Sequence, residues 1–275
     1  MDKNIHIQPR YCRLYTVPDI ERKESNFHFA HMDWDIPLNQ AALVCVDVWA
    51  WCGASDNWQR TDQITREKIV PVVEACRQQG LQVIHAPAWP VATKHPNWVA
   101  LLGGEVQTEA IYPVPGMTQP APEYPDSPEW PPKEFVSKTG GYAQYAPPHE
   151  PQRDADVAHC NDHRAFHPAL PPVEDEAVIM NGEELHRLCA QRGIVHLFYV
   201  GFHTNMCITW RDYSPFQMTF FRHYNCMMLR DCTTGMETSE TFDDLTCTRG
   251  TVATMEQVGI HTLTGEEMIT ALNAS

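Results

Sequence analysis

The chain has 275 residues, of which 43% are hydrophobic and 20% are charged, a composition typical of a globular protein with a sizeable core. Its 35 acidic residues outnumber its 20 basic residues and give a formal net charge of −15. This charge argues against nucleic acid and anionic membranes as partners, because both require basic patches.

The first residues, 1–6, are polar and lead into no apolar segment, so we expect no secretory signal. No run of about 18 apolar residues is present, so we expect no membrane span. Ten cysteines are scattered along the chain without the compact spacing of a disulfide framework. We therefore expect reduced thiols and a cytoplasmic protein.

The chain divides into segments of different composition. Residues 1–40 are polar and aromatic and suggest an N-terminal arm or cap. Residues 113–172 hold 14 of the 22 prolines, so this Pro-rich insertion cannot form regular core structure. Strand and helix patterns occupy residues 41–112 and resume from residue 173.

Six short apolar segments predict strands. The first, 41–46, lacks alternation, as expected for a strand buried on both faces of a parallel sheet. The others are 81–86, 176–180, 194–200, 225–230 and 260–263.

Helical patterns separate these strands. Apolar residues at helical spacing predict a helix from near Thr65 to Gly80, with Pro71 marking a start or a kink close by. Asn181 is a good N-cap for a second helix that ends at Gly193. The alternation predicts an α/β fold in which helices cover both faces of a mainly parallel sheet.

Two reactive residues follow strands of this sheet. Asp47 ends the first strand, and Cys207 lies just after the fourth in Gly-Phe-His-Thr-Asn-Met-Cys-Ile, residues 201–208. Ligands bind beyond the carboxyl ends of parallel strands, near the point where strand order reverses. If Thr204 caps the next helix, Cys207 occupies its first turn, where free N–H groups and the helix dipole favour a thiolate and an oxyanion. Asp47 could then act as general base and general acid.

Each of these residues also has a common structural role. A cysteine after a buried strand is often a small core residue. An aspartate at a strand end is often a loop or cap residue.

Three motifs in order resemble the isochorismatase-like cysteine hydrolases. The Cys207 turn resembles their nucleophile turn, and Ala-Leu-Val-Cys-Val-Asp-Val at 42–48 resembles their first strand with its catalytic aspartate. Leu-Arg-Asp-Cys-Thr at 229–233 resembles a later strand end. Together the matches span about residues 41–90 and 173–265, and the cysteine turn is the most specific of them.

The resemblance implies a single domain over residues 1–275, a three-layer α/β/α sandwich of Rossmann type around a six-stranded, mainly parallel sheet. It implies an Asp-Lys-Cys triad that cleaves small amides, carbamoyl compounds or a vinyl ether. The oxyanion would be held by the turn His203, Thr204, Asn205 and Met206, with a non-proline cis peptide at His203–Thr204. Family analogy also favours a homo-oligomer.

The family's lysine is missing after the third strand, where this chain has Met180-Asn181-Gly182. Lys138 could be displaced into the role by the Pro-rich insertion, or it could be a solvated loop residue. Without a lysine, a helix terminus or a histidine would have to stabilise the thiolate.

We predict no metal and no cofactor. The metal ligands of nicotinamidase members are absent from Ala86-Pro87-Ala88-Trp89-Pro90, and His85 and His95 do not rebuild that site. His159, His163 and His167 have a spacing that would place three imidazoles on one helix face, but a loop is the more frequent structure in Pro-rich sequence.

Aromatic residues flank the strand ends. Trp49 and Trp89, together with Trp51 and Trp58, could line a pocket for a planar substrate, or they could pack in the core or at a subunit interface.

The sequence thus predicts a cysteine-dependent hydrolase of a small amide, ureido or related C–N substrate. Three alternatives remain open: a vinyl-ether hydrolase, a non-catalytic binding or scaffold protein on the same fold, and a metal-dependent hydrolase that uses the 159–167 histidines.

Overall fold

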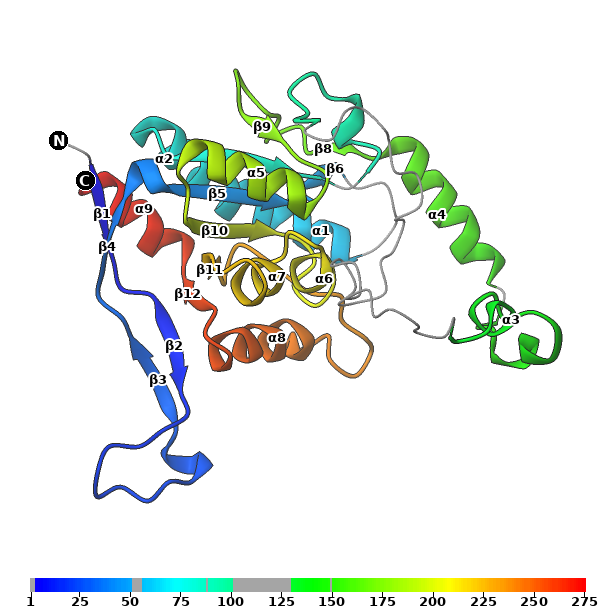
Figure 1. The fold of residues 1–275 in the computed structure, drawn as a ribbon, viewed down its shortest axis with the longest axis horizontal. Helices are drawn as coiled ribbons and strands as arrows, with labels where there is room; N and C mark the ends of the chain where they lie inside the picture. The colour runs from blue at the N-terminus through cyan, green and yellow to red at the C-terminus, as the bar shows by residue number, and fades with distance from the viewer. Residues whose placement is uncertain (1–2, 51–55, 88, 101–129, 149) are drawn as a thin grey trace.

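The computed structural model describes residues 3–50, 56–87, 89–100, 130–148 and 150–275. Six parallel strands form the centre of its main sheet, in the order β12-β11-β10-β5-β7-β9 (Figure 1). All six predicted strands are confirmed. They are β5 (Ala41–Val46), β7 (Gln82–Ala86), β9 (Ala177–Val178), β10 (His196–Gly201), β11 (Asn225–Leu229) and β12 (His261–Leu263).

Strand order reverses between β5 and β10, which are adjacent and parallel with Gly201 opposite Val46. The chain runs outward from β5 to β7 and β9 on one side, then crosses back and continues from β10 to β11 and β12 on the other. Gly201 has φ +117°, and a Cβ at this position would lie 1.9 Å from the carbonyl oxygen of Val46. Only glycine permits this approach of the two strand ends.

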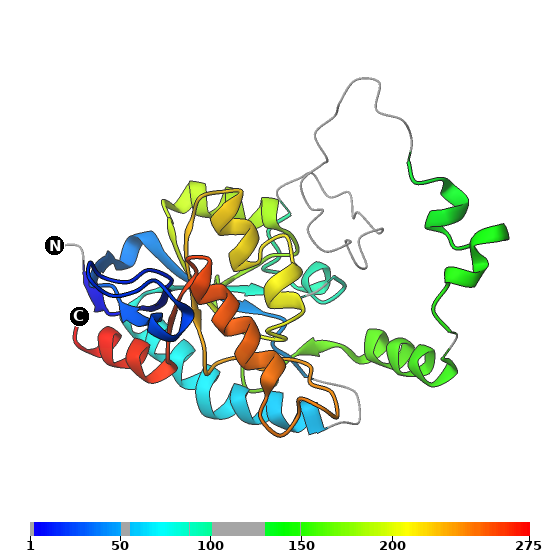
Figure 2. The ribbon, with the colours of Figure 1, turned by 90° about the horizontal axis from the view of Figure 1, so that it is seen from below.

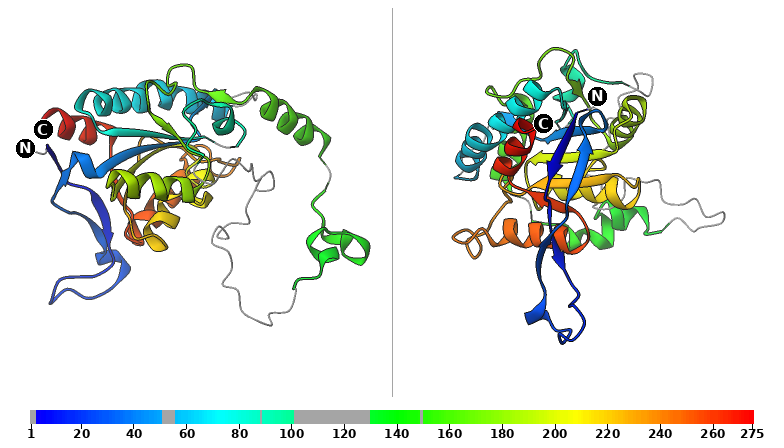
Figure 3. Two further views of the ribbon diagram at one scale, coloured as in Figure 1. Left: turned by 45° about the horizontal axis from the view of Figure 1, so that its top comes forward. Right: turned by 90° about the vertical axis from the view of Figure 1, so that its left-hand side faces the viewer.

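Helices cover both faces of the sheet, which confirms the three-layer sandwich (Figures 2 and 3). One face packs against α2 (Val70–Gln79) and α9 (Gly265–Asn273), and the other packs against α5 (Gly182–Arg192), α7 (Pro215–Phe220) and α8 (Thr246–Gln257). The strands have apolar residues on both sides because each side meets a helical layer. Alternate residues of β5 therefore enter different cores: Leu43 lies in one and Val44 in the other.

The helix after β5 begins earlier than the sequence pattern indicates. It consists of α1 (Asp56–Ile64), the π-helical turn η3 (Thr65–Ile69) and α2. Pro71 lies in the first turn of α2, where a missing N–H is tolerated, and the wider π turn precedes it. The predicted end is correct, since Gly80 closes α2 with φ +78°.

The helix α5 has the predicted ends. The Asn181 side chain accepts a hydrogen bond from the N–H of Glu184 at 2.8 Å, and Gly193 ends the helix in the left-handed region. Both signals are local, so the sequence alone was sufficient to place this helix.

The N-terminal arm is part of the fold. The strands β1 (Asn4–Ile7) and β4 (Trp34–Pro37) form a two-stranded antiparallel sheet that buries Ile5 and Ile36 in the core. The strands β2 (Arg10–Arg13) and β3 (His28–His31) extend the main sheet beyond β12 in antiparallel pairing, so it has eight strands in the described part of the chain. Two 3₁₀ turns, η1 (Glu24–Asn26) and η2 (Leu38–Gln40), complete the arm.

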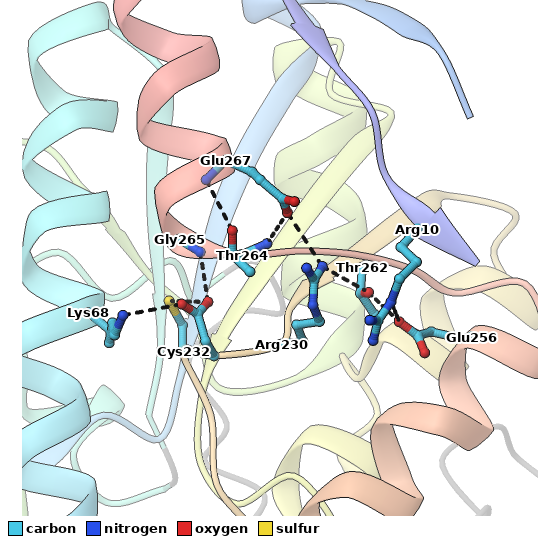
Figure 4. A network of polar contacts seen from close by, with 10 residues as sticks. Arg10, Lys68, Arg230, Cys232, Glu256, Thr262, Thr264, Gly265 and Glu267 are labelled. Atoms are coloured by element: carbon cyan, nitrogen blue, oxygen red, sulfur yellow. Dashed lines mark hydrogen bonds and ion pairs between the residues drawn. The ribbon is translucent and has the colours of Figure 1, made fainter. Parts of the chain in front are cut away.

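Polar contacts connect the N-terminal arm to α8, and the start of α9 to the segment after β11 (Figure 4). Arg10 donates to the buried carboxylate of Glu256 at 2.8 Å, which joins β2 to α8. At the start of α9, Asp231 accepts a hydrogen bond from the N–H of Gly265 at 2.7 Å, and Lys68 lies 3.6 Å from the same carboxylate. Asp231 therefore has a structural role.

Most described residues of the Pro-rich insertion are exposed, but Leu170 near its end packs into the core. In Figures 1 and 2, α4 projects away from the sheet. Among the described residues, no helix is long and apolar enough to cross a membrane. The remaining elements are α3 (Lys133–Val136), η5 (Gly140–Tyr145), α4 (Pro151–His163), a ribbon of β6 (Trp49–Ala50) with β8 (Ala165–Phe166), η4 (Ala92–Lys94) and α6 (Cys207–Trp210).

Candidate active site

Asp47 lies at the end of β5, at the point where strand order reverses. Asp47 is 2% exposed, and its backbone N–H donates to the carbonyl of Ala86 at 3.1 Å. One carboxylate oxygen, Oδ2, accepts from Nη2 of Arg211 at 3.1 Å, with Nε at 3.4 Å. The other, Oδ1, is buried and has no partner with hydrogen-bond geometry among the described residues. This oxygen is available to accept a proton.

Cys207 is the first residue of the short helix α6, next to the Asp47 carboxylate. The first residue of a helix has no intrahelical acceptor for its own N–H, so this donor is available to a ligand. Thr204 is not the cap of α6, contrary to the prediction, because Met206 occupies that position. The Thr204 hydroxyl instead shares a 2.7 Å hydrogen bond with Thr233, and its N–H donates to Thr234. The helix therefore begins two residues later than the predicted cap at Thr204 implied.

The thiol of Cys207 is not ionised at rest, so the expectation of a low thiol pKa is wrong. Burial raises the pKa of this thiol to about 12, and the negative charge of Asp47 raises it further. Arg211 and the backbone N–H of His203 act in the opposite direction but do not compensate. The helix is only four residues long, so its dipole is small. The site therefore contains a protonated thiol beside a carboxylate with one open oxygen.

The cation of the site is Arg211, which the sequence analysis missed. Burial disfavours its charge, but the Asp47 carboxylate holds the pKa of the guanidinium well above its usual value. Its side chain is 19% exposed, and that of Asp47 is 1% exposed. Arg211 follows Cys207 by four residues, and its N–H donates to the Cys207 carbonyl at 3.1 Å. Because residues four apart share a helix face, this spacing was a signal that could have identified it.

Lys138 is not brought to these residues. It lies in an exposed segment after α3, where its Nζ is 3.5 Å from the centre of the Phe135 ring. Figures 1 and 2 show α3 well apart from α6.

The rest of the turn divides between buried and exposed side chains. Burial and then the nearby Arg60 lower the pKa of His203 to about 4, so its ring is neutral at pH 7. Asn205 binds the backbone of Met236 through both ends of its amide, each at 2.9 Å, and Met206 is 43% exposed. The non-proline cis peptide bond that the described residues contain is Phe202–His203, so the expected position at His203–Thr204 is wrong by one residue.

Of the four tryptophans predicted to line a pocket, the structure describes Trp49, Trp58 and Trp89. Trp49 belongs to the β6–β8 ribbon, and the Arg164 guanidinium stacks over its ring at 4.1 Å. Trp89 follows β7, and its Nε1 is buried without a hydrogen-bond partner in the described part of the chain. Trp58 is 38% exposed on α1, and Trp51 lies outside the described residues.

The three spaced histidines do not share a helix face. His159 and His163 stack on α4 with ring centres 4.2 Å apart, but the helix ends at His163. His167 is buried elsewhere and contacts Oδ1 of Asp62 through Nε2 at 2.8 Å. His85 contacts Glu176 at 2.9 Å. No group of three or more potential metal ligands occurs within the ranges that the structure describes.

No protein-family model matches this chain, and no curated protein matches its sequence. Solved structures do match. A cysteine hydrolase from Pseudomonas syringae pv. phaseolicola 1448A aligns with a TM-score of 0.54 and 15% identity, over 88% of this chain and 96% of that one. An isochorismatase from Pseudomonas putida KT2440 gives 0.47 and 14%, over 83% and 90%, and a nicotinamidase pyrazinamidase from Acinetobacter baumanii gives 0.43 and 16%, over 84% and 98%. The chain thus has the fold of the isochorismatase-like cysteine hydrolases, as its motifs predicted.

Proposed function

We propose that this protein is a cysteine-dependent hydrolase of a small amide, ureido or related C–N substrate. The observation that carries the proposal is the meeting of Asp47, Cys207 and Arg211 where strand order reverses. A nucleophile beside a base that a third group orients is the usual arrangement for covalent catalysis. A buried ion pair next to a thiol also has no packing advantage over apolar side chains, so a functional reason is expected.

The raised thiol pKa fits a reaction in which proton transfer accompanies attack. The sulfur of Cys207 attacks the substrate carbonyl while Oδ1 of Asp47 accepts the thiol proton. The carbonyl electrons move to oxygen, where the N–H group of Cys207 at the start of α6 can receive the negative charge. The intermediate collapses, the C–N bond breaks, and Asp47 returns the proton to the leaving nitrogen. Water, deprotonated by Asp47, then attacks the thioester and releases the acid, and the sulfur regains its proton.

Arg211 would have an electrostatic role rather than a proton-transfer role. An arginine guanidinium stays protonated in proteins, so it cannot act as an acid in this cycle. It can hold the Asp47 carboxylate in one orientation through Oδ2 and leave Oδ1 toward the thiol. Its charge also stabilises negative charge on the sulfur.

A vinyl-ether substrate is the alternative within the same fold. The structures that resemble this chain include one described as an isochorismatase and one described as a nicotinamidase. Both kinds of substrate therefore belong in the same assay.

The raised pKa of Cys207 favours one candidate of another class, a non-catalytic binding protein on this fold. Such a protein would need no reactive thiol. It predicts that Cys207 carries no covalent intermediate with any substrate.

Turnover of a panel of small amides, ureido compounds and vinyl ethers tests these proposals. Cys207→Ala should abolish turnover of any substrate found, while Cys12→Ala, which removes another partly exposed thiol on β2, should not. Acid quenching during turnover should trap an acyl group on the peptide that contains Cys207. Retained turnover in Cys207→Ala would refute the hydrolase mechanism.

We also propose that the chain forms a homo-oligomer. Four large apolar side chains on or beside α6 and α7 are exposed, namely Met206, Trp210, Phe220 and Phe221. Exposed apolar groups of this size often belong to interfaces. Light scattering after size exclusion should give a mass of at least two chains, and a monomer at micromolar concentration would contradict this.

A further inference from the structure

The turn that carries Cys207 runs beside residues 232–236, and backbone hydrogen bonds join the two segments. Gly201 donates to the carbonyl of Cys232, and Thr204 donates to that of Thr234, each at 3.0 Å. These contacts align the turn with its neighbour, but they leave the side chain of His203 to be fixed by another element.

That element is α1, which follows β5 in the chain, whereas the Cys207 turn follows β10. Asn57 is 7% exposed, and its Oδ1 lies 2.7 Å from Nε2 of His203, while its Nδ2 donates to the carbonyl of Gly235 at 3.2 Å. Arg60, one turn later, donates to the hydroxyl of Thr234 at 2.8 Å and to the Gly235 carbonyl at 3.1 Å. One face of α1 therefore contacts both the nucleophile turn and the segment beside it.

An amide oxygen selects one form of a histidine ring. Since Oδ1 of Asn57 can only accept, Nε2 of His203 carries the proton in this contact. The Arg60 charge opposes protonation of the second ring nitrogen, and burial opposes it as well. The backbone N–H of the same residue, His203, interacts with the sulfur of Cys207.

We propose that Asn57 and Arg60 are positioning residues for the nucleophile, which hold His203 as a neutral ring and keep its backbone N–H against the Cys207 sulfur. This inference rests on the proposed function for its purpose but not for its test, because the reactivity of Cys207 can be measured without a substrate. Among the described residues, Asp47 and Arg211 are charged groups that act on the sulfur, and Arg60 is a charged group that acts on the His203 ring.

Two substitutions of Asn57 should change thiol reactivity in opposite directions. Asn57→Leu removes both hydrogen bonds at similar volume, so the N–H of His203 moves off the sulfur. Because the hydrogen bond to the thiolate is lost, alkylation of Cys207 at fixed pH should slow roughly 10-fold or more. Asn57→Asp retains an acceptor for His203 but adds a negative charge that favours the imidazolium. A cation would then lie near the sulfur, and alkylation should be faster than in the unchanged protein.

The measurement is the rate of iodoacetamide modification of Cys207 between pH 6 and 10, followed by peptide mapping. Asn97→Leu is a matched control, because the Asn97 amide also makes two hydrogen bonds, here both as donor to the carbonyls of Glu174 and Glu176, away from the turn. It should lower stability without a change in Cys207 reactivity. If Asn57→Leu does not fold, Asn57→Ser and Arg60→Met give the same test through a smaller and a more distant change.

Opposite changes in the alkylation rate exclude a simple packing role, since a loss of packing would change the rate in the same direction in both variants. Equal slowing in Asn57→Leu and Asn57→Asp, or no change in either, would overturn the proposal. A shift in Cys207 alkylation combined with intact turnover in Cys207→Ala would instead refute the hydrolase and leave the positioning intact.

Discussion

The ion pair between Asp47 and Arg211 gives the most direct test of the site. Arg211→Met keeps the length and much of the volume of the side chain but removes the charge. It leaves the Asp47 carboxylate, 1% exposed, without its cation. Removing one partner of a buried pair costs about 3–5 kcal/mol, and the 19% exposure of Arg211 places the expected loss near the lower end, about 3 kcal/mol.

A double-mutant cycle with Asp47→Asn separates the pair from other effects of each substitution. The double variant should be more stable than the sum of the two single losses predicts, because no charge is left buried. We expect a coupling of about 1–3 kcal/mol from urea unfolding at pH 7. Arg211→Lys should recover part of the stability, since a lysine keeps the charge but not the planar fork. Additivity within about 0.5 kcal/mol would show that the two charges do not interact, and the proposed site would lose its cation.

Three further predictions concern the thiol, an acidic cap and a strand end. Asp47→Asn removes a charge that raises the pKa of the Cys207 thiol, so alkylation at pH 7 should accelerate about 10-fold for each unit by which that pKa falls. Turnover should fall by about 10²–10⁴, because the general base is lost. Slower alkylation would contradict this electrostatic role of Asp47. Burial raises the pKa of Glu237, but hydrogen bonds from the start of α8 outweigh it and lower the pKa to about 2. The folded value is below the unfolded one, so this stabilisation is present above about pH 4.5 and lost toward pH 2. Glu237→Gln should therefore cost about 1 kcal/mol at pH 7, less at pH 3 and little at pH 2 in urea titrations, and an equal cost at pH 7 and pH 2 would refute the linkage. Gly201→Ala would place a Cβ 1.9 Å from the Val46 carbonyl oxygen, so it should lower the melting temperature by more than 10 °C or prevent folding. Gly80→Ala is the control: a Cβ there has nothing within 4 Å, so the variant should cost only about 1 kcal/mol from its left-handed φ. Equal losses of stability in the two variants would contradict the close approach.

The candidate site was only partly accessible to sequence reasoning. Asp47 and Cys207 were found because each follows a strand and belongs to a recognisable motif. Arg211 was not found because it shares no motif with them, and its contact with Asp47 spans 164 positions. The thiol pKa was predicted in the wrong direction, because burial and the neighbouring carboxylate depend on packing and not on the helix start alone.

The sequence by itself determined the six parallel strands and the ends of α5, since apolar runs, Asn181 and Gly193 act through local hydrogen bonds and burial. Tertiary structure alone decided that β2 and β3 join the main sheet, and that α1 contacts the Cys207 turn. The first depends on the pairing of β2 with β12, and the second on the adjacency of β5 and β10, which brings distant residues together at one edge. A local pattern specifies which residues are buried, but only the assembled sheet specifies which of them meet.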